Sequence, residues 1–248
     1  MRMKYIAFFF APLFFLTGCG EDLIIQQQPV PDDFGISLIL YSNRLKQVGV
    51  ISKTVDPARN VLDDTTHFYP HAVLRVDDTP FSAIPNDSLF LRKYRDRDFT
   101  YNYYTDSMSI ISGQTYRLHI DLGNGRTITG QTIVPQGIEP DSVTESEYYY
   151  YISWRGPDSL SYSWILWANA GTPEHPDWSP FIRGYSGHET YARIKKKSLM
   201  GFSQFYMYVH TYDLNYTNYV TEKRQTSGLS GGYGVFGSIK SDGFWVTF

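Results

Sequence analysis

The chain has 248 residues, a net charge of −3, a single cysteine and 17% aromatic residues, 21 of them tyrosines. One cysteine excludes an internal disulfide and a metal site built from several thiolates, and the charge argues against nucleic acid as a partner, despite the basic run at 193–197. Helix-favouring runs are few, so the high aromatic content predicts β structure with tyrosine-covered faces.

The chain opens with a cationic head, Arg2 and Lys4, followed by an uncharged and mostly apolar run at 5–16. This run is too short to cross roughly 30 Å of hydrocarbon as a helix, and Pro12 interrupts it. Both features are typical of a signal peptide, which we expect over residues 1–18. The alternative is a buried N-terminal helix.

The end of this segment, Leu16-Thr17-Gly18-Cys19, resembles the bacterial lipobox. The resemblance implies that the Cys19 thiol is alkylated with diacylglycerol, that the chain is cut before Cys19, and that its new amine is acylated. Several acyl chains anchor a protein stably, so the outer membrane is an expected partner through them. A catalytic role for Cys19 is the alternative, but it would need a folded pocket that a signal segment does not offer.

Residues 19–33 are polar and contain two prolines, which predicts a lipidated tether. Its acids Glu21 and Asp22 resemble the export signals of lipoproteins of Bacteroidota, which implies the outer face of the outer membrane. Localisation is therefore expected to be at the cell surface, held by lipid.

Residues 34–137 show short strands separated by turn signals, without a helical pattern between them. Apolar residues alternate at 36–40, and another short apolar run lies at 73–76. The clearest element is a hairpin over 114–135, with the turn-forming Asn-Gly pair at 124–125. This pattern predicts an immunoglobulin-like β-sandwich domain.

Residues 138–248 predict a second, aromatic-rich β domain with one short helix. Its expected elements are strands at 148–154 and 162–167 joined as a hairpin by a turn at 156–158, a strand at 204–212, a helix at 214–225 capped by Asp213, a tight glycine turn at 231–237 and a last strand at 244–248. In the glycine turn, Val235 and Phe236 are expected to fill the core.

Three segments together, SGQTYRLHIDLGNGRTITGQTIVP, YDLNYTNYVTEK and GGYGVFG, resemble the domain of unknown function 4249 family of Bacteroidota lipoproteins. Tyr233 and Gly228 depart from the residues common in that family. The resemblance implies an outer-membrane lipoprotein encoded near TonB-dependent receptors, and hence a TonB-dependent receptor as a partner. The activity of that family is itself unknown, so no catalytic residue follows from it.

A pattern of aspartate, then serine or threonine, then an apolar residue or threonine resembles the O-glycosylation sites of exported Bacteroidota proteins. The hydroxyl residues in this pattern are Thr65, Ser88, Ser107, Ser142 and Ser159. Ordinary turn chemistry is the alternative, since Asp-Ser pairs favour turns. Glycosylation would require these residues to lie on exposed loops.

The sequence contains no catalytic or metal-binding motif. Ser186 lacks the glycine spacing of a hydrolase elbow, and His188-Glu189 lacks a second histidine for zinc. We therefore expect no catalytic residue, no metal ion and no cofactor. Paired glycosidase carboxylates stay open, because they carry no local signature.

The tryptophans and the tyrosine run at 148–151 are the best candidates for a binding surface, although core packing is the alternative for each of them. Trp178 lies in a polar stretch predicted to be a loop, and Tyr149 and Tyr151 share one face of a predicted strand. These three are the predicted ligand or partner contacts. The sequence thus favours a non-enzymatic surface-binding or transporter-accessory lipoprotein; the alternative is a structural or adhesive component without a small-molecule ligand.

Overall fold

The computed structural model describes residues 34–53, 67–85, 101–123, 125–169, 175, 177–199 and 201–248. The predicted signal peptide, Cys19 with Leu16, Thr17 and Gly18, and the tether lie outside these residues, as do Thr65 and Ser88. No helix of the described residues is long and apolar enough to span a membrane.

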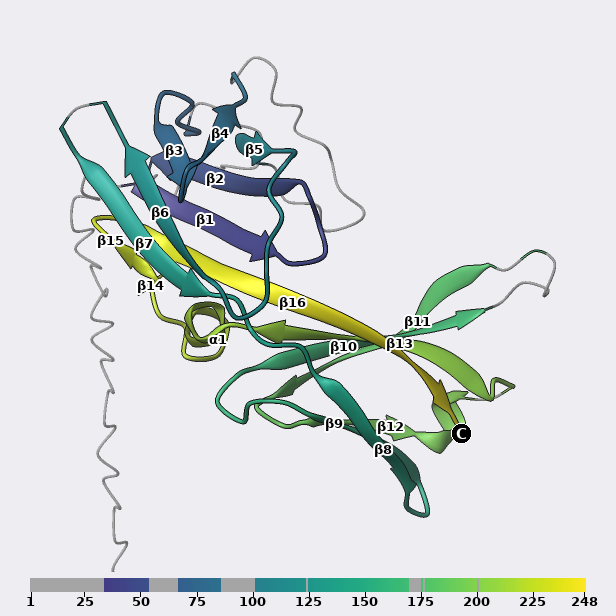
Figure 1. Ribbon diagram of the computed structural model, residues 1–248. Helices are drawn as coiled ribbons and strands as arrows, with labels where there is room; N and C mark the ends of the chain where they lie inside the picture. Colours follow the sequence, from purple (N-terminus) through teal and green to yellow (C-terminus); the bar gives the residue numbers. More distant parts are fainter. Residues whose placement is uncertain are drawn as a thin grey trace, which may run out of the picture.

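The described chain is mostly β, as predicted, and its strands form sandwich-like layers (Figure 1). The strands of the N-terminal half are β1 (Phe34–Tyr41), β2 (Gln47–Lys53), β3 (Val73–Val76), β4 (Thr79–Ala83), β5 (Tyr103–Thr105), β6 (Thr115–Asp121) and β7 (Thr127–Ile133). The elements that follow are β8 (Glu139–Glu145), β9 (Tyr149–Arg155), β10 (Tyr162–Asn169), β11 (Trp178–Gly187), β12 (Tyr191–Lys195), the 3-10 helix η2 (Lys196–Leu199), β13 (Gln204–Tyr212), α1 (Leu214–Thr221), β14 (Thr226–Ser227), β15 (Leu229–Ser230) and β16 (Tyr233–Thr247).

Two sheets contain all of these strands. The large sheet has the order β11-β10-β13-β16-β1-β2-β5-β4-β3-β6-β7-β15, with β14 paired beside β16, and the small sheet has the order β12-β9-β8. The long strand β16 runs through both halves of the molecule (Figure 1). Its first part pairs in parallel with β1, and its second part pairs antiparallel with β13.

Each half has its own hydrophobic core. The first core lies under the N-terminal strands, where the alternating residues Ile36, Leu38 and Leu40 are buried, as their pattern predicts. The second core lies between the small sheet and the β10, β13 and β16 part of the large sheet. Phe236 of β16 packs into the first core and Val246 into the second, so one strand ties both cores together.

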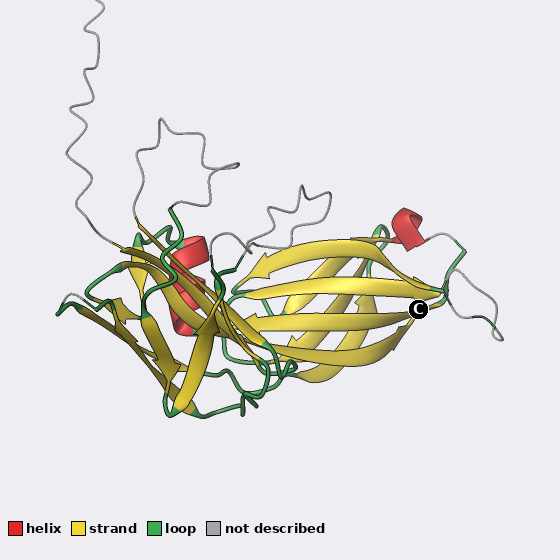
Figure 2. Cartoon of the chain, turned by 90° about the horizontal axis from the view of Figure 1, so that it is seen from above, coloured by secondary structure: helices red, strands yellow, loops and turns green. Residues whose placement is uncertain are grey.

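The helix α1 begins where predicted, because the Oδ1 atom of Asp213 accepts a hydrogen bond from the Tyr216 N–H at 2.8 Å. The helix ends at Thr221, four residues before the predicted end. It packs beside β16, and the Asn215 side chain donates to the carbonyl oxygens of Gln131 and Phe236. Figure 2 shows α1 within the half that contains the first core. The helix therefore joins β7 to β16.

The hairpin over 114–135 is confirmed as β6 and β7, but the predicted hairpin of 148–154 with 162–167 is wrong. The strand β9 pairs with β8 and β12 in the small sheet, whereas β10 pairs with β11 and β13 in the large sheet. The chain between them crosses from one sheet to the other. Trp154 and Tyr162 pack edge to face across the core with ring centroids 5.6 Å apart, and the Tyr162 hydroxyl donates to the Pro157 carbonyl at 2.7 Å. Burial of these two large rings favours two facing strands over a paired hairpin.

The glycine segment 231–237 is also different from its prediction. Val235 and Phe236 are buried, as expected, but the segment from Tyr233 onward is strand rather than tight turn. Gly234 has a φ of 104° and lies against the backbone of Ile36, where a Cβ atom would collide with the Ile36 carbonyl oxygen. The missing side chain of Gly234 thus allows the parallel strands β1 and β16 to lie close together. The last strand begins at Tyr233 instead of Phe244.

Candidate functional site

The outer side of the second half carries a group of aromatic rings on β10, β11, β13 and β16. Along β13, Phe205, Met207 and Val209 are buried in the second core, so the residues between them, Tyr206 and Tyr208, face outward. The strand register places Trp167 of β10 and Trp245 of β16 on either side of Tyr206. We call Trp167, Trp178, Tyr206, Tyr208 and Trp245 the aromatic face.

The rings of the aromatic face form a connected chain of edge-to-face contacts. Trp178 and Trp245 have centroids 5.2 Å apart at an interplanar angle of 64°, and Tyr206 lies 5.1 Å from Trp245 at 75°. Tyr208 lies 4.9 Å from Tyr206 and 6.4 Å from Trp167. Such arrangements match the preferred geometry of aromatic quadrupoles and fix the rings relative to one another.

Gly243 makes room for this packing. A Cβ atom at Gly243 would lie 2.7 Å from Cε1 of Tyr206, so the tyrosine ring lies over a position that has no side chain. Gly243 is paired with Tyr208 and Trp245 with Tyr206, so the Tyr206 ring leans along β16 over the glycine. The face is therefore shaped by strand residues rather than by loops.

Two tryptophans of the aromatic face are exposed: Trp245 by 53% and Trp178 by 39%. Large apolar rings gathered on one exposed face mark an interaction site more often than scattered ones do. Tryptophan is also enriched at the energetic centres of protein interfaces. The aromatic face is hence the strongest candidate for a contact surface in the described residues.

The structure places the predicted contact Trp178 on an edge strand and not on a loop. It is the first residue of β11 and pairs with Asn169 of β10. The prolines around it suggested a loop, but Pro180 is tolerated because β11 has a paired neighbour on one side only. Of the other tryptophans, Trp154 and Trp164 belong to the second core.

Tyr149 and Tyr151 lie on the outer face of the small sheet, as alternation along β9 predicts. Tyr150 between them turns toward the second core and packs against Phe248 at 4.4 Å. The ring of Tyr151 lies 6.5 Å from Tyr149 and 6.0 Å from Tyr191 of β12. Tyr191 was not predicted; the alternation of buried Ala192 and Ile194 after it was the signal for this strand.

No protein-family model matches the sequence, and no curated protein matches it. Among solved structures, the chain is similar to the crystal structure of the FN1–FN3 domains of chicken CNTN1, with 11% sequence identity and a TM-score of 0.28. The match covers 87% of this chain and 67% of that chain.

The predicted glycosylation residues that the structure describes are Ser107, Ser142 and Ser159, and all three are exposed. Ser107 and Ser159 lie in a bend and a turn. Ser142 lies within β8 instead of on a loop, where its Oγ atom is 3.2 Å from that of Ser153. Its exposure comes from the position of β8 at the edge of the small sheet.

Two titratable groups that are largely buried, Asp213 and His210, have shifted pKa values. Burial raises the pKa of Asp213 to about 6, although hydrogen bonds from the Thr132 hydroxyl and from backbone N–H groups favour its charged form. Burial, and then the nearby Arg44, lower the pKa of His210, whose Nδ1 atom is 2.7 Å from the Ser241 hydroxyl. Asp213 caps α1 and His210 lies on β13, so the two groups belong to structural contacts. Within the described ranges, no group of three or more histidine, cysteine or acidic side chains is placed to hold a metal ion.

Proposed function

We propose that this protein is a non-enzymatic lipoprotein, anchored to the outer membrane by acyl chains on Cys19 and exposed at the cell surface. The lipobox-like sequence Leu16-Thr17-Gly18-Cys19 supports the anchor, because it places the single thiol directly after a signal-peptide pattern. The protein binds a partner as an accessory subunit of a TonB-dependent nutrient transporter. The family resemblance supports this choice of partner.

The observation that carries the binding role is the exposure of Trp178 and Trp245 on the aromatic face. Trp245 stands on β16, whose Val246 packs into the second core, and Trp178 packs against Trp245 at 5.2 Å, so the pair is held in place before any partner arrives. A preorganised surface loses less side-chain entropy on binding than a flexible one does. The partner thus gains apolar contact area at rings that are already ordered.

The anchor and the partner are tested separately. Protease shaving and antibody labelling of intact cells are compared between wild type and Cys19→Ala. We expect cleavage and labelling in wild type and loss of anchoring in the variant. Protection of the wild type until the outer membrane is broken would place it in the periplasm and contradict surface exposure.

For the partner, cross-linking in intact cells is compared between wild type, Trp245→Ala and the control Leu45→Ala. Leu45 is also exposed, by 65%, but lies in the N-terminal half. We expect mass spectrometry to identify a TonB-dependent receptor with wild type and with the control, and to find it strongly reduced with Trp245→Ala. If wild type is anchored at the surface but no receptor is cross-linked to it, the result would favour a structural or adhesive component instead.

A further inference from the structure

The outer face of the small sheet differs in chemistry from the aromatic face. Alternation along β9 places Tyr149, Tyr151, Ser153 and Arg155 on one side of the sheet, in that order. The register with β12 puts Tyr191 beside Ser153. Three tyrosine rings therefore form a row with polar groups at one end, and we call Tyr149, Tyr151 and Tyr191 the tyrosine row.

The tyrosine row is held by its neighbours. The guanidinium carbon of Arg193 lies 5.1 Å from the ring centre of Tyr149, a stacking distance for a cation and an aromatic face. The Tyr191 hydroxyl donates to Oε1 of Glu189 at 3.1 Å. The separation of 6.5 Å between the Tyr149 and Tyr151 rings follows the two-residue repeat of a strand, which is roughly 6.6 Å. The spacing of the row is thus fixed by the backbone.

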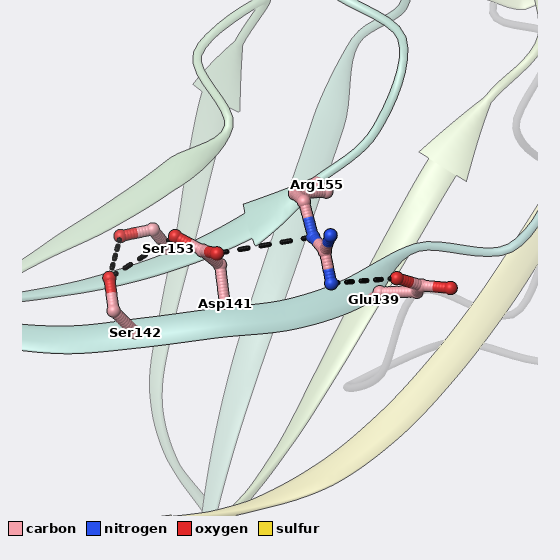
Figure 3. A network of polar contacts seen from close by, with 5 residues as sticks. All are labelled: Glu139, Asp141, Ser142, Ser153 and Arg155. Atoms are coloured by element: carbon pink, nitrogen blue, oxygen red, sulfur yellow. Dashed lines mark hydrogen bonds and ion pairs between the residues drawn. The ribbon is translucent and has the colours of Figure 1, made fainter.

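Next to the tyrosine row, β8 and β9 carry a group of polar side chains, which we call the polar rail: Glu139, Asp141, Ser142, Ser153 and Arg155 (Figure 3). The Ser142 and Ser153 hydroxyls meet at 3.2 Å, and Ser142 also donates to Asp141 at 3.3 Å. Arg155 pairs with Glu139 at 2.9 Å and lies 3.9 Å from Asp141. All seven residues of β8 are exposed, so these donors and acceptors are open to a ligand.

We propose that the tyrosine row and its polar rail bind a neutral polysaccharide chain. Aromatic rings offer flat faces to the C–H surfaces of sugar rings, while hydroxyl, guanidinium and carboxylate groups donate to and accept from sugar hydroxyls. A regular row of rings suits a polymer with a repeating unit. Charges of both signs are mixed on this face, since Arg155 pairs with Glu139 and Arg193 lies over Tyr149. The face therefore has no field of one sign, which fits an uncharged ligand.

Other classes of ligand fit this face less well. The centre of a protein interface is depleted of charged residues, whereas this face carries exposed ion pairs next to the rings. A nucleic acid would bring its phosphates against Glu139 and Asp141 on a chain with a net charge of −3. The polar rail likewise opposes insertion of the face into lipid.

The test is affinity electrophoresis of the full mature chain, made in a host without O-glycosylation, through gels that contain dextran, starch, mannan or xylan. We expect retardation in at least one neutral polysaccharide. Tyr151→Ala should weaken the retardation about ten-fold, because both the stacked ring and the polar contact of its hydroxyl are lost. Tyr151→Phe keeps the ring and should retain most of the binding.

Two variants keep the proposal open to refutation. Tyr233→Ala removes a tyrosine that is 40% exposed but lies outside both the tyrosine row and the aromatic face, and it should leave retardation unchanged. Tyr191→Ala gives a second loss at a residue of the row, in case Tyr151→Ala fails to fold as judged by circular dichroism. Three results would overturn the proposal: no retardation in any neutral gel, equal retardation of wild type and both row variants, or stronger binding to polygalacturonate than to the neutral chains.

This inference goes beyond the proposed function and uses different residues. Loss of polysaccharide binding would leave the transporter partner and the lipid anchor untouched, since neither involves the small sheet. Conversely, a periplasmic location would contradict surface exposure but not binding by the purified protein.

Discussion

Acidification should stabilise the protein through Asp213. This carboxyl group is only 3% exposed, and its pKa is raised from 3.8 to about 6 by burial. The folded state therefore holds a proton more tightly than the unfolded state does. The stabilising contribution is complete below about pH 4 and is lost as the pH rises through 6. A shift of about two pKa units corresponds to about 3 kcal/mol of unfolding free energy.

The Asp213→Asn variant isolates this effect. Asparagine caps helices as well as aspartate does, so the Oδ1 bond from the Tyr216 N–H can persist, but the side chain does not ionise. Urea unfolding of wild type and variant is measured at intervals from pH 4 to pH 7.5. Between these limits, we expect the stability of wild type relative to the variant to fall by about 2.5 kcal/mol, since at pH 4 the unfolded carboxyl is still partly protonated.

The comparison also removes the contribution of His210. The lowered pKa of His210 means that its neutral form stabilises the fold above about pH 6.5, and this contribution is lost on acidification. Both proteins contain His210, so its effect cancels in their difference. A second variant, Thr132→Val, removes the hydroxyl that donates to Asp213 and should move the pH window upward. A stability difference that stays constant between pH 4 and pH 7.5 would refute the reasoning.

Two further predictions concern packing. Gly234→Ala should destabilise the fold by about 2 kcal/mol, since a Cβ at this positive φ meets the Ile36 carbonyl oxygen; a loss below about 0.5 kcal/mol in urea unfolding would show that β1 and β16 separate easily. Trp154→Ala should cost about 3–5 kcal/mol, whereas Trp245→Ala should cost less than about 1 kcal/mol, because only the first ring is in the core. Equal losses in thermal and urea unfolding would contradict the assignment of Trp245 to an open face.

Local alternation explains which parts of the fold could be predicted from the sequence. In the strands β1, β6, β7 and β13, buried residues alternate with more exposed ones. Each strand can therefore be recognised from the alternation of apolar and polar residues over a few positions. The capping aspartate of α1 is an equally local signal. The supposed hairpin of β9 with β10 failed because pairing depends on partners distant in the chain. Two neighbouring strands with the same pattern can pair or can face each other across a core.

The candidate site was harder to predict for the same reason. Tyr206 and Tyr208 are visible as alternating aromatics within one strand, but their grouping with Trp167 and Trp245 depends on a register across three strands. The prolines near Trp178 are typical of a loop, and only the edge position of β11 explains them. Sequence alternation did separate Tyr149 and Tyr151 from Tyr150, because that separation needs no information beyond the strand itself.

The two candidate surfaces lie on opposite outer sides of one sandwich. The inner side of the small sheet and the inner side of β10, β13 and β16 meet in the second core, so their outer sides face away from each other. A partner on the aromatic face and a polysaccharide on the tyrosine row would therefore not compete for space. Both surfaces also depend on the same core, so loss of Trp154 should disturb each of them, whereas a substitution on one outer side should leave the other unchanged.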